Sequence, residues 1–345
     1  MTQSASEMVT AALDAVASGQ DLSADRAAEV LAEIMNGNVP DAQIAGLLIA
    51  LRTKGETVDE LAGLARAMRA LAVPVRARAG ELLDTAGTGG GRRSFNVSTT
   101  AALIAAGAGC AVAKHGNRSA TSLSGSADVL EALGARIDLD AAGVARCIEE
   151  AGFGFMFAPA HHQATRFVIG VRRELAVRTI FNFLGPLTNP AGARRQLVGV
   201  SDVRYLETIA GALAQLGVER ALVVAGEDGL DEVSASAPTR VVEVNGPELR
   251  AYTVTPAELG VAAGTDEGPA GGTPERNAGV TRAVLGGEPG PARELALVNA
   301  GAAIYAAGAA DSLAAGVERA RAAIDDGSAI RTLERYVATT VEAAR

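Results

Sequence analysis

The sequence has no tryptophan, two cysteines and three histidines among its 345 residues. So little cysteine and histidine excludes a disulfide framework and leaves no zinc-ligand spacing, and we expect Cys110 and Cys147 to be buried, reduced thiols. No run of about eighteen consecutive apolar residues occurs, which argues against a membrane-spanning helix. Residues 1–20 lack a basic start followed by a long apolar run, so we expect a cytoplasmic protein.

Positive charge is also scarce. The chain has 31 Lys and Arg against 40 Asp and Glu, a formal net charge of −9. This balance argues against general binding to nucleic acid or to an acidic membrane. An anionic small molecule stays possible because local charge decides such binding. Four cations lie within one stretch of 27 residues: Arg92, Arg93, Lys114 and Arg118.

Apolar residues make up 48% of the chain, yet aromatic residues make up only 3%. Small aliphatic side chains must therefore fill a large core. That composition suits helices packed closely on both faces of a parallel sheet.

The pattern of apolar residues divides the chain into two domains. Residues 1–73 show helical spacing with no strand signal, and Thr57 and Glu60 form a capping-box pair. From residue 74 onward, short apolar runs alternate with helical stretches, which predicts strands over 81–86, 110–113, 153–157, 196–200 and 221–225.

We therefore predict an α/β fold: a small all-helical domain over 1–73 and a larger α/β domain over 74–345 with a mostly parallel central sheet covered by helices. Two runs, 241–244 and 249–254, are typical of a hairpin, and 258–277 is predicted to be a surface loop. A proline-interrupted segment near 176–194 is predicted to return to the helical domain.

Two glycine- and serine-rich loops carry the clearest chemical signal. The first, Gly87–Gly91, follows a predicted strand and precedes a helix predicted over 97–107. It is not a dinucleotide fingerprint, because the third glycine of that motif would fall on Arg92. Hydroxyls and free N–H groups at the start of the following helix favour a bound phosphate. Simple helix capping by Asn96 or Ser98 is the alternative reading.

The second loop, residues 114–126, repeats this logic after the next strand with an ammonium, a guanidinium and several hydroxyls. A basic turn exposed to solvent is the alternative. Together the two loops predict that backbone N–H groups and positive charge surround a highly phosphorylated ligand.

Three further features complete the predicted site. The adjacent carboxylates Asp231 and Glu232 fit Mg²⁺, a hard cation that bridges phosphates, although an acidic surface turn would look the same in sequence. Arg172 lies on a predicted helix and fits a substrate carboxylate, or else an ordinary salt bridge. His161 and His162 have no metal-ligand partners, so either one lines a pocket or is simply partly buried.

These motifs resemble the anthranilate phosphoribosyltransferases of tryptophan biosynthesis over nearly the whole chain. The similarity rests on the glycine loop with residues 96–99, the run 114–118, the segments 171–174 and 178–190, and the 231–232 pair. Residues 41–57 also resemble the helical domain of pyrimidine nucleoside phosphorylases. The loop that begins Lys114-His115-Gly116-Asn117-Arg118 separates the two families.

The resemblance implies a homodimer that transfers the phosphoribosyl group of 5-phosphoribosyl 1-diphosphate to anthranilate and releases pyrophosphate. It implies Lys114 as the catalytic residue and Mg²⁺ held by Ser98, Asp231 and Glu232. Anthranilate would contact Gly87, Asn117, His162 and Arg172. The donor would contact Gly87, Gly90, Gly91, Ser94, Asn96, Val97, Ser98, Thr99, Lys114, His115, Gly116, Asn117, Arg118, Ser119, Ala120, Thr121, Ser122 and Ser126.

Three departures from the family pattern stand out. Gly91 replaces the acid that usually follows the glycine run, the loop before Phe95 is one residue shorter, and Thr165 stands where an aromatic residue is sometimes found. Two other functions stay open at this stage: a pyrimidine nucleoside phosphorylase-like enzyme and a non-catalytic binding paralogue. A related aminobenzoate acceptor is a further possibility.

Overall fold

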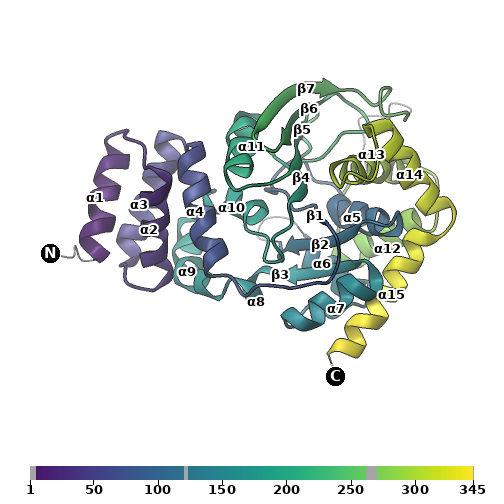
Figure 1. Ribbon diagram of the computed structural model, residues 1–345, viewed down its shortest axis with the longest axis horizontal. Coiled ribbons are helices and arrows are strands. Elements are labelled where there is room, and N and C mark those ends of the chain that lie inside the picture. The colour runs from purple at the N-terminus through teal and green to yellow at the C-terminus, as the bar shows by residue number, and fades with distance from the viewer. Residues whose placement is uncertain (1–4, 120–122, 262–269, 345) are drawn as a thin grey trace.

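The computed structural model describes residues 5–119, 123–261 and 270–344. Four helices form the N-terminal part of the fold (Figure 1). They are α1 (Ala5–Ala17), α2 (Ala24–Met35), α3 (Asp41–Lys54) and α4 (Val58–Ala70). The predicted capping box of α4 is present: the Thr57 hydroxyl accepts from the Glu60 N–H, and the Glu60 carboxylate accepts from the Thr57 N–H.

A seven-stranded sheet forms the centre of the larger part, in the order β3-β2-β1-β4-β5-β6-β7. The first five strands in that order are parallel, and β6 and β7 form the predicted antiparallel hairpin. The α/β prediction with a mostly parallel sheet is therefore confirmed. The strands are β1 (Leu82–Asp84), β2 (Ala111–Gly116), β3 (Phe153–Phe157), β4 (Arg195–Gly199), β5 (Arg220–Gly226), β6 (Thr239–Asn245) and β7 (Glu248–Val254).

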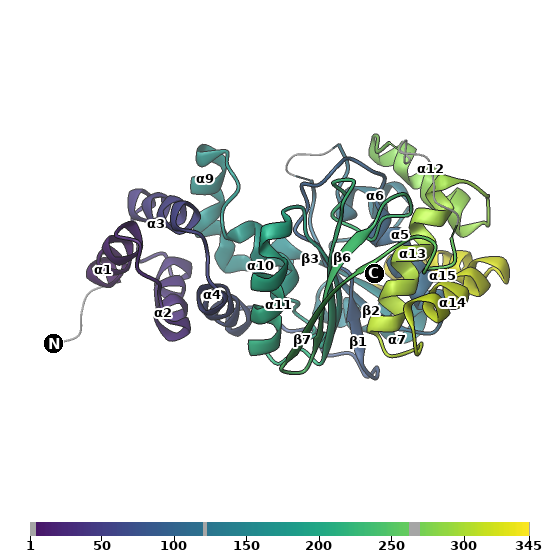
Figure 2. The ribbon, with the colours of Figure 1, turned by 90° about the horizontal axis from the view of Figure 1, so that it is seen from above.

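Helices cover both faces of this sheet (Figure 2). Side chains alternate between the faces along each strand, so Leu222 and Val224 of β5 join one core while Ala221 and Val223 join the other. The first core is shared with α5 (Val97–Gly107), α6 (Ser126–Ala132), α7 (Ala141–Ala151), α12 (Pro274–Leu285), α13 (Pro291–Ala306), α14 (Leu313–Asp325) and α15 (Ser328–Ala343).

The second core continues from the sheet into the helical part. It contains buried side chains of α1–α4 together with α9 (Arg166–Leu175), α10 (Phe181–Leu187) and α11 (Leu206–Gln215). The chain thus returns to the N-terminal helices through α9 and α10, as Figure 1 shows. Short turns precede these helices: α8 (Ala158–His161), η1 (Gln163–Thr165) and, before α11, η2 (Val203–Tyr205).

Two sequence predictions need correction. The predicted loop over 258–277 ends earlier, because α12 begins at Pro274, with the Thr273 hydroxyl accepting from the Arg276 N–H. Proline at the first position of a helix costs no hydrogen bond, so this proline starts a helix where composition indicated a loop. The strand predicted over 110–113 extends to Gly116 as β2. Within the described residues, no helix is both long and apolar enough to cross a bilayer.

Candidate active site

The glycine loop lies at the carboxyl end of the parallel strands, where the order of the sheet reverses. From β1 the chain adds β2 and β3 on one side, then β4 and β5 on the other. Loops on either side of such a switch point part and leave a crevice. The Thr88 N–H donates to the Gly199 carbonyl at the end of β4, 2.8 Å away. The first predicted phosphate loop is therefore fixed at this switch point.

Two glycines of this loop are required by their surroundings. Gly90 has a φ of 92°, a conformation that other residues rarely adopt, and a Cβ there would collide with the Arg178 guanidinium. Arg178 in turn donates to the Gly89 carbonyl at 2.8 Å. A Cβ at Gly91 would lie 2.6 Å from the Asp231 backbone nitrogen and would also collide with its carboxylate. The absence of a side chain at Gly91 therefore lets Asp231 lie against the loop.

Lys114 lies near the carboxyl end of the buried β2 strand, beside Thr85, which precedes the glycine loop. Its side chain is fully buried, and Nζ donates to the Thr85 carbonyl at 3.1 Å, to Thr85 Oγ1 at 3.0 Å and to Ser98 Oγ at 3.3 Å. Burial lowers the pKa of Lys114, while the carboxylates of Asp84 and Glu232 oppose that change. An ammonium in this position has an unusually strong field because little water screens it.

Asp231 and Glu232 approach the start of α5 from the turn that follows β5. Burial raises the pKa of Asp231, and burial together with the Asp231 charge raises the pKa of Glu232 to about 8. Lys114 and a hydrogen bond from the Ser98 backbone act in the opposite direction on Glu232. Two adjacent carboxylates with little access to water are disfavoured by their own charge, so this pair is suited to a cation.

The donor set fits Mg²⁺ better than a transition metal. It consists of two carboxylates and the Ser98 hydroxyl, all oxygen ligands, and within the described residues no three His, Cys, Asp or Glu side chains gather to hold a metal. Mg²⁺ commonly binds to one or two carboxylates and takes its remaining ligands from water and substrate phosphates. The structure brings Ser98 and Glu232 together, because the Ser98 N–H donates to the Glu232 carboxylate, and Asp231 is the neighbour of Glu232 in the chain.

Asn96 joins the two predicted phosphate loops. Its amide donates to the Ser124 carbonyl at 3.2 Å, and the Ser124 hydroxyl donates back to Asn96 Oδ1 at 3.0 Å. Asn277 also donates to Asn96 Oδ1, at 2.8 Å, and accepts from the Gly272 N–H at 2.8 Å. Three loops that are distant in sequence are therefore held together around residue 96.

Two of the four clustered cations are already paired with carboxylates. Arg92 forms an ion pair with Asp228 at 3.0 Å, and Arg118 forms ion pairs with Asp128 and Glu131. Arg118 is about half-exposed and also lies over the Phe157 ring. These contacts stabilise the loops. The predicted contact of Arg118 with the phosphoribosyl donor stays a prediction, and it requires Arg118 to bind the donor as well as Asp128 and Glu131.

Arg172 is different, because it forms no ion pair with any residue in the described ranges. Its guanidinium lies 5.3 Å from the centre of the Phe181 ring, and burial lowers its pKa. A partly buried guanidinium without a carboxylate partner favours an incoming anion. The predicted contact with a substrate carboxylate therefore has a suitable side chain.

Each of the three histidines bonds to a backbone carbonyl. His115 bonds to Gly185, His161 to Val73 and His162 to Thr188. The rings of His115 and His162 are 5.1 Å apart, and burial lowers their pKa values to about 4 and about 3. Both rings are therefore neutral near pH 7. His115 joins β2 to α10, and His162, directly after α8, joins that turn to Thr188 at the end of α10.

The remaining predicted residues fall into three groups. Val97 and Thr99 are buried in the first turn of α5, so their side chains are covered and only their backbone is left to contact a ligand. Ala120, Thr121 and Ser122 lie outside the described residues. The others border the two loops at strand ends or helix starts: Gly87, Ser94, Gly116, Asn117, Ser119 and Ser126.

Sequence reasoning missed several residues that build the site. Asp84 is fully buried at the end of β1 and accepts from the His115 N–H at 3.1 Å and from Asn189 Nδ2 at 2.7 Å. Asn189 also donates to the Ala113 carbonyl at 2.8 Å, so this pair joins β1, β2 and the returning segment. Asp84 could have been found from the sequence, because a carboxylate at the end of an otherwise apolar strand is unusual and indicates a functional or bonded group. Nothing local indicated Asn189 or Asn277.

The comparisons with known proteins identify this fold as that of a two-domain group-transferring enzyme. Two family models match the chain: the helical bundle domain of a glycosyl transferase family over residues 10–72, and the a/b domain of that family over residues 79–330.

Curated relatives make the assignment specific. The chain is 51% identical to the anthranilate phosphoribosyltransferase of Moorella thermoacetica over 332 residues, which is 96% of this chain and 98% of that protein. It is 53% identical to that of Thermomicrobium roseum, over 95% of this chain and 96% of the relative. The chain belongs to the anthranilate phosphoribosyltransferase family of glycosyl transferases.

Solved structures agree with the sequence comparison. The crystal structure of anthranilate phosphoribosyltransferase from Thermus thermophilus matches with a TM-score of 0.91 at 48% identity, over 96% of this chain and 99% of that one. The enzyme from Saccharomyces cerevisiae in complex with PRPP, the phosphoribosyl donor, and Mg matches with a TM-score of 0.88 at 26% identity, over 97% and 98%.

Proposed function

We propose that the crevice between the glycine loop and the α9–α10 segment is where the phosphoribosyl group passes from 5-phosphoribosyl 1-diphosphate to anthranilate. The observation that carries this proposal is the position of the buried Lys114 ammonium. It donates to Thr85, which precedes the glycine loop, and to Ser98 in the first turn of α5, and the Glu232 carboxylate acts on its charge. The ammonium, the N–H groups of the loop and the N-terminal end of the helix attract a diphosphate, and the two carboxylates would do so only through a bound cation.

The reaction needs no nucleophilic side chain. The bond between ribose C1 and the diphosphate oxygen breaks, and its electrons leave with pyrophosphate. The anthranilate amine supplies the electron pair for the new bond to C1 and afterwards loses one proton to the released pyrophosphate or to water. Lys114 stabilises the negative charge that develops on the departing oxygen, which is the electrostatic effect that usually dominates such catalysis.

Ser98, Asp231 and Glu232 would hold Mg²⁺, whose chemistry is to neutralise charge on the diphosphate. The relative from Saccharomyces cerevisiae in complex with PRPP and Mg supports the use of Mg²⁺ with this donor. The N–H groups of the glycine loop and of the first turn of α5 would bind the phosphate oxygens.

Arg172 would bind the anthranilate carboxylate through two parallel hydrogen bonds and so direct the amine toward C1. The neutral ring of His162 and the Asn117 side chain would line the acceptor's path. The relative solved in complex with 4-fluoroanthranilate, 25% identical over 97% of this chain, supports an acceptor of this kind.

We also propose that the enzyme is a homodimer. Ile49 of α3 and Ile169 of α9 expose 37% and 48% of their surface, and α3 packs beside α9. Exposed aliphatic side chains on adjacent helices are suited to a partner subunit. Light scattering coupled to size-exclusion chromatography tests this, and a monomer mass at micromolar concentration would refute it.

The activity test follows anthranilate fluorescence after addition of the donor with Mg²⁺, with and without EDTA. Fluorescence loss that requires both donor and metal is expected, and Lys114→Gln should reduce turnover about 100-fold or more. Cleavage of a nucleoside with phosphate, and no use of anthranilate, would instead assign the crevice to a phosphorylase reaction. Wild-type turnover in Lys114→Gln would remove Lys114 from the mechanism.

A further inference from the structure

Arg178 connects the returning segment to the glycine loop, although it lies 89 positions from Gly89 in the chain. Its Nη1 donates to the Gly89 carbonyl at 2.8 Å, and its Nη2 donates to the Thr88 carbonyl at 3.4 Å. One planar guanidinium thus engages two successive carbonyls, a geometry that arginine provides and lysine does not. Arg178 is half-buried and forms no ion pair with a described residue. Its side-chain hydrogen bonds are therefore directed at the loop.

The backbone around Arg178 is itself held in place. The Arg52 guanidinium of α3 donates to the Arg178 carbonyl at 2.9 Å. The next N–H along the chain, that of Thr179, donates to Asn182 Oδ1 at 2.9 Å. Just before this point Ala176 ends α9 with a φ of 52°, a conformation that is uncommon outside glycine. The Arg178 side chain therefore extends from a fixed segment and can fix the loop in turn.

The two carbonyls that Arg178 engages determine the direction of two N–H groups. The peptide bonds of the loop are trans, and in a trans peptide the carbonyl and the N–H point in opposite directions. The N–H groups of Gly89 and Gly90 therefore point away from Arg178. Among the residues that the structure describes, neither N–H donates to a protein acceptor. Successive N–H groups on one side of a turn form the kind of concave site that binds an anion.

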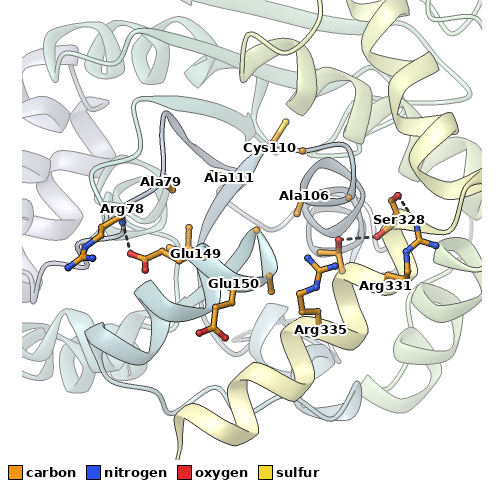
Figure 3. Close-up of a pocket in the computed structure, with 16 residues that line it drawn as sticks. Arg78, Ala79, Ala106, Cys110, Ala111, Glu149, Glu150, Ser328, Arg331 and Arg335 are labelled. Atoms are coloured by element: carbon orange, nitrogen blue, oxygen red, sulfur yellow. Dashed lines mark hydrogen bonds between the residues drawn. The ribbon is translucent and has the colours of Figure 1, made fainter.

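Charged residues around a hollow of about 560 Å³, at the opposite end of the strands, show a different situation (Figure 3). Arg331 donates to the Ser328 hydroxyl at 2.9 Å, and Arg146 pairs with Glu150 at 2.8 Å. These partners lie three and four positions apart on the same helix, so the contacts stabilise the helices locally. Arg178 differs because it bonds to a loop that belongs to another part of the chain.

We propose that Arg178 is a positioning residue for the phosphoribosyl donor. It holds the Thr88 and Gly89 carbonyls on one side of the loop, so that the Gly89 and Gly90 N–H groups point to the diphosphate on the other side. A phosphate bound by these N–H groups lies on the side of the loop away from the guanidinium, so Arg178 acts through the loop. This inference rests on the proposed function only for the identity of the donor.

Amide hydrogen exchange of the full-length enzyme without substrate tests the loop directly. The N–H groups of Thr88, Gly91 and Arg92 donate to acceptors outside the loop, so their exchange rates report how often the loop opens. In Arg178→Ala these amides should exchange at least about fivefold faster, because the two carbonyls are released. Arg250→Ala, on the exposed β7 strand, is the control and should exchange like the wild type.

Steady-state kinetics test the consequence for the donor. Arg178→Ala should raise KM for the donor about tenfold or more, while kcat at saturating donor changes less than about threefold, because the loop binds the diphosphate in the ground state and the transition state alike. KM for anthranilate at saturating donor should stay at the wild-type value. Arg178→Lys keeps the charge and loses the planar guanidinium, so it should restore only a small part of the donor affinity.

Three results would overturn the proposal. They are an unchanged exchange rate in Arg178→Ala, an unchanged KM for the donor in that variant, and wild-type donor affinity in Arg178→Lys, which would assign the effect to charge alone.

Failure of the proposed function has a different signature, because the wild-type enzyme itself then leaves anthranilate unconsumed. Calorimetry with Mg²⁺ and inorganic pyrophosphate measures binding at the loop without turnover. Weaker binding by Arg178→Ala than by the wild type supports the positioning role in that case too, and equal binding refutes it.

Discussion

Replacing Gly91 with alanine is the sharpest test of how the metal-binding pair is positioned. The family pattern usually has an acid at this position, yet in this fold Gly91 lies directly against Asp231. A Cβ there would lie 2.6 Å from the Asp231 backbone nitrogen, and ordinary van der Waals contact begins near 3.4 Å. The loop or the Asp231 turn must therefore move.

The size of the movement sets the expected effect. Restoring ordinary contact requires a shift of nearly 1 Å, and a misplacement of that size at a catalytic group costs about 100-fold in rate. We therefore expect kcat/KM to fall about 100-fold, equivalent to about 2.7 kcal/mol of transition-state stabilisation. The Mg²⁺ concentration needed for half-maximal rate should rise as well, because Asp231 is one of the proposed ligands.

The assay follows anthranilate fluorescence at saturating donor while the Mg²⁺ concentration is varied. Gly80→Ala is the matched control, since a Cβ at that glycine meets nothing within 4 Å. Thermal unfolding of both variants separates a local shift from a general loss of stability. We expect the control to behave like the wild type in all three measurements.

A Gly91→Ala enzyme with wild-type kcat/KM and an unchanged Mg²⁺ requirement would refute this reasoning. It would mean that the loop gives way without moving Asp231, or that Asp231 does not bind the metal. Gly91→Asp extends the test: the family's usual acid should also reduce activity here, because the shorter loop leaves no space for it.

Three further predictions concern other parts of the molecule. Arg172→Ala should raise KM for anthranilate about 10- to 100-fold with little change in KM for the donor, because a charged hydrogen-bond pair is lost. Steady-state kinetics measure both KM values, and Arg166→Ala is the control. Burial lowers the pKa of His162 to about 3, so below about pH 6.5 the unfolded chain takes up a proton that the folded chain does not. Stability should therefore be full above that pH and decline as the pH falls toward 3, with a shallower decline in His162→Asn in urea titrations. Asn277→Ala should lower the free energy of unfolding by about 1–3 kcal/mol, since it leaves Asn96 and the Gly272 N–H without this partner; an unchanged denaturation midpoint would contradict the proposed joining of the three loops.

Local patterns predicted most of the secondary structure correctly. The helix over 97–107 and the strand over 153–157 have the predicted bounds, because each is a continuous apolar or small-residue run with clear ends. The hairpin of β6 and β7 is also present. The start of α12 was missed because glycine, proline and threonine precede it, and only its capping contact distinguishes a helix start from a loop.

The sequence alone determined the fold class, the two phosphate-suited loops and the types of residue available for the chemistry, because those depend on periodicity and on neighbours along the chain. Only the tertiary structure decided which cations are free. Arg92 and Arg118 are paired with carboxylates that come into contact with them only when the loops fold, whereas Lys114 is buried beside carboxylates from β1 and from the turn after β5. Two other features also depend on residues more than a hundred positions apart. One is the contact between Gly91 and Asp231, and the other is the hydrogen bond between Asp84 and Asn189 that joins β1 to the returning segment. Such contacts leave no local pattern in the sequence. A polar residue at the end of a strand has the same sequence signature whether or not the fold gives it a partner.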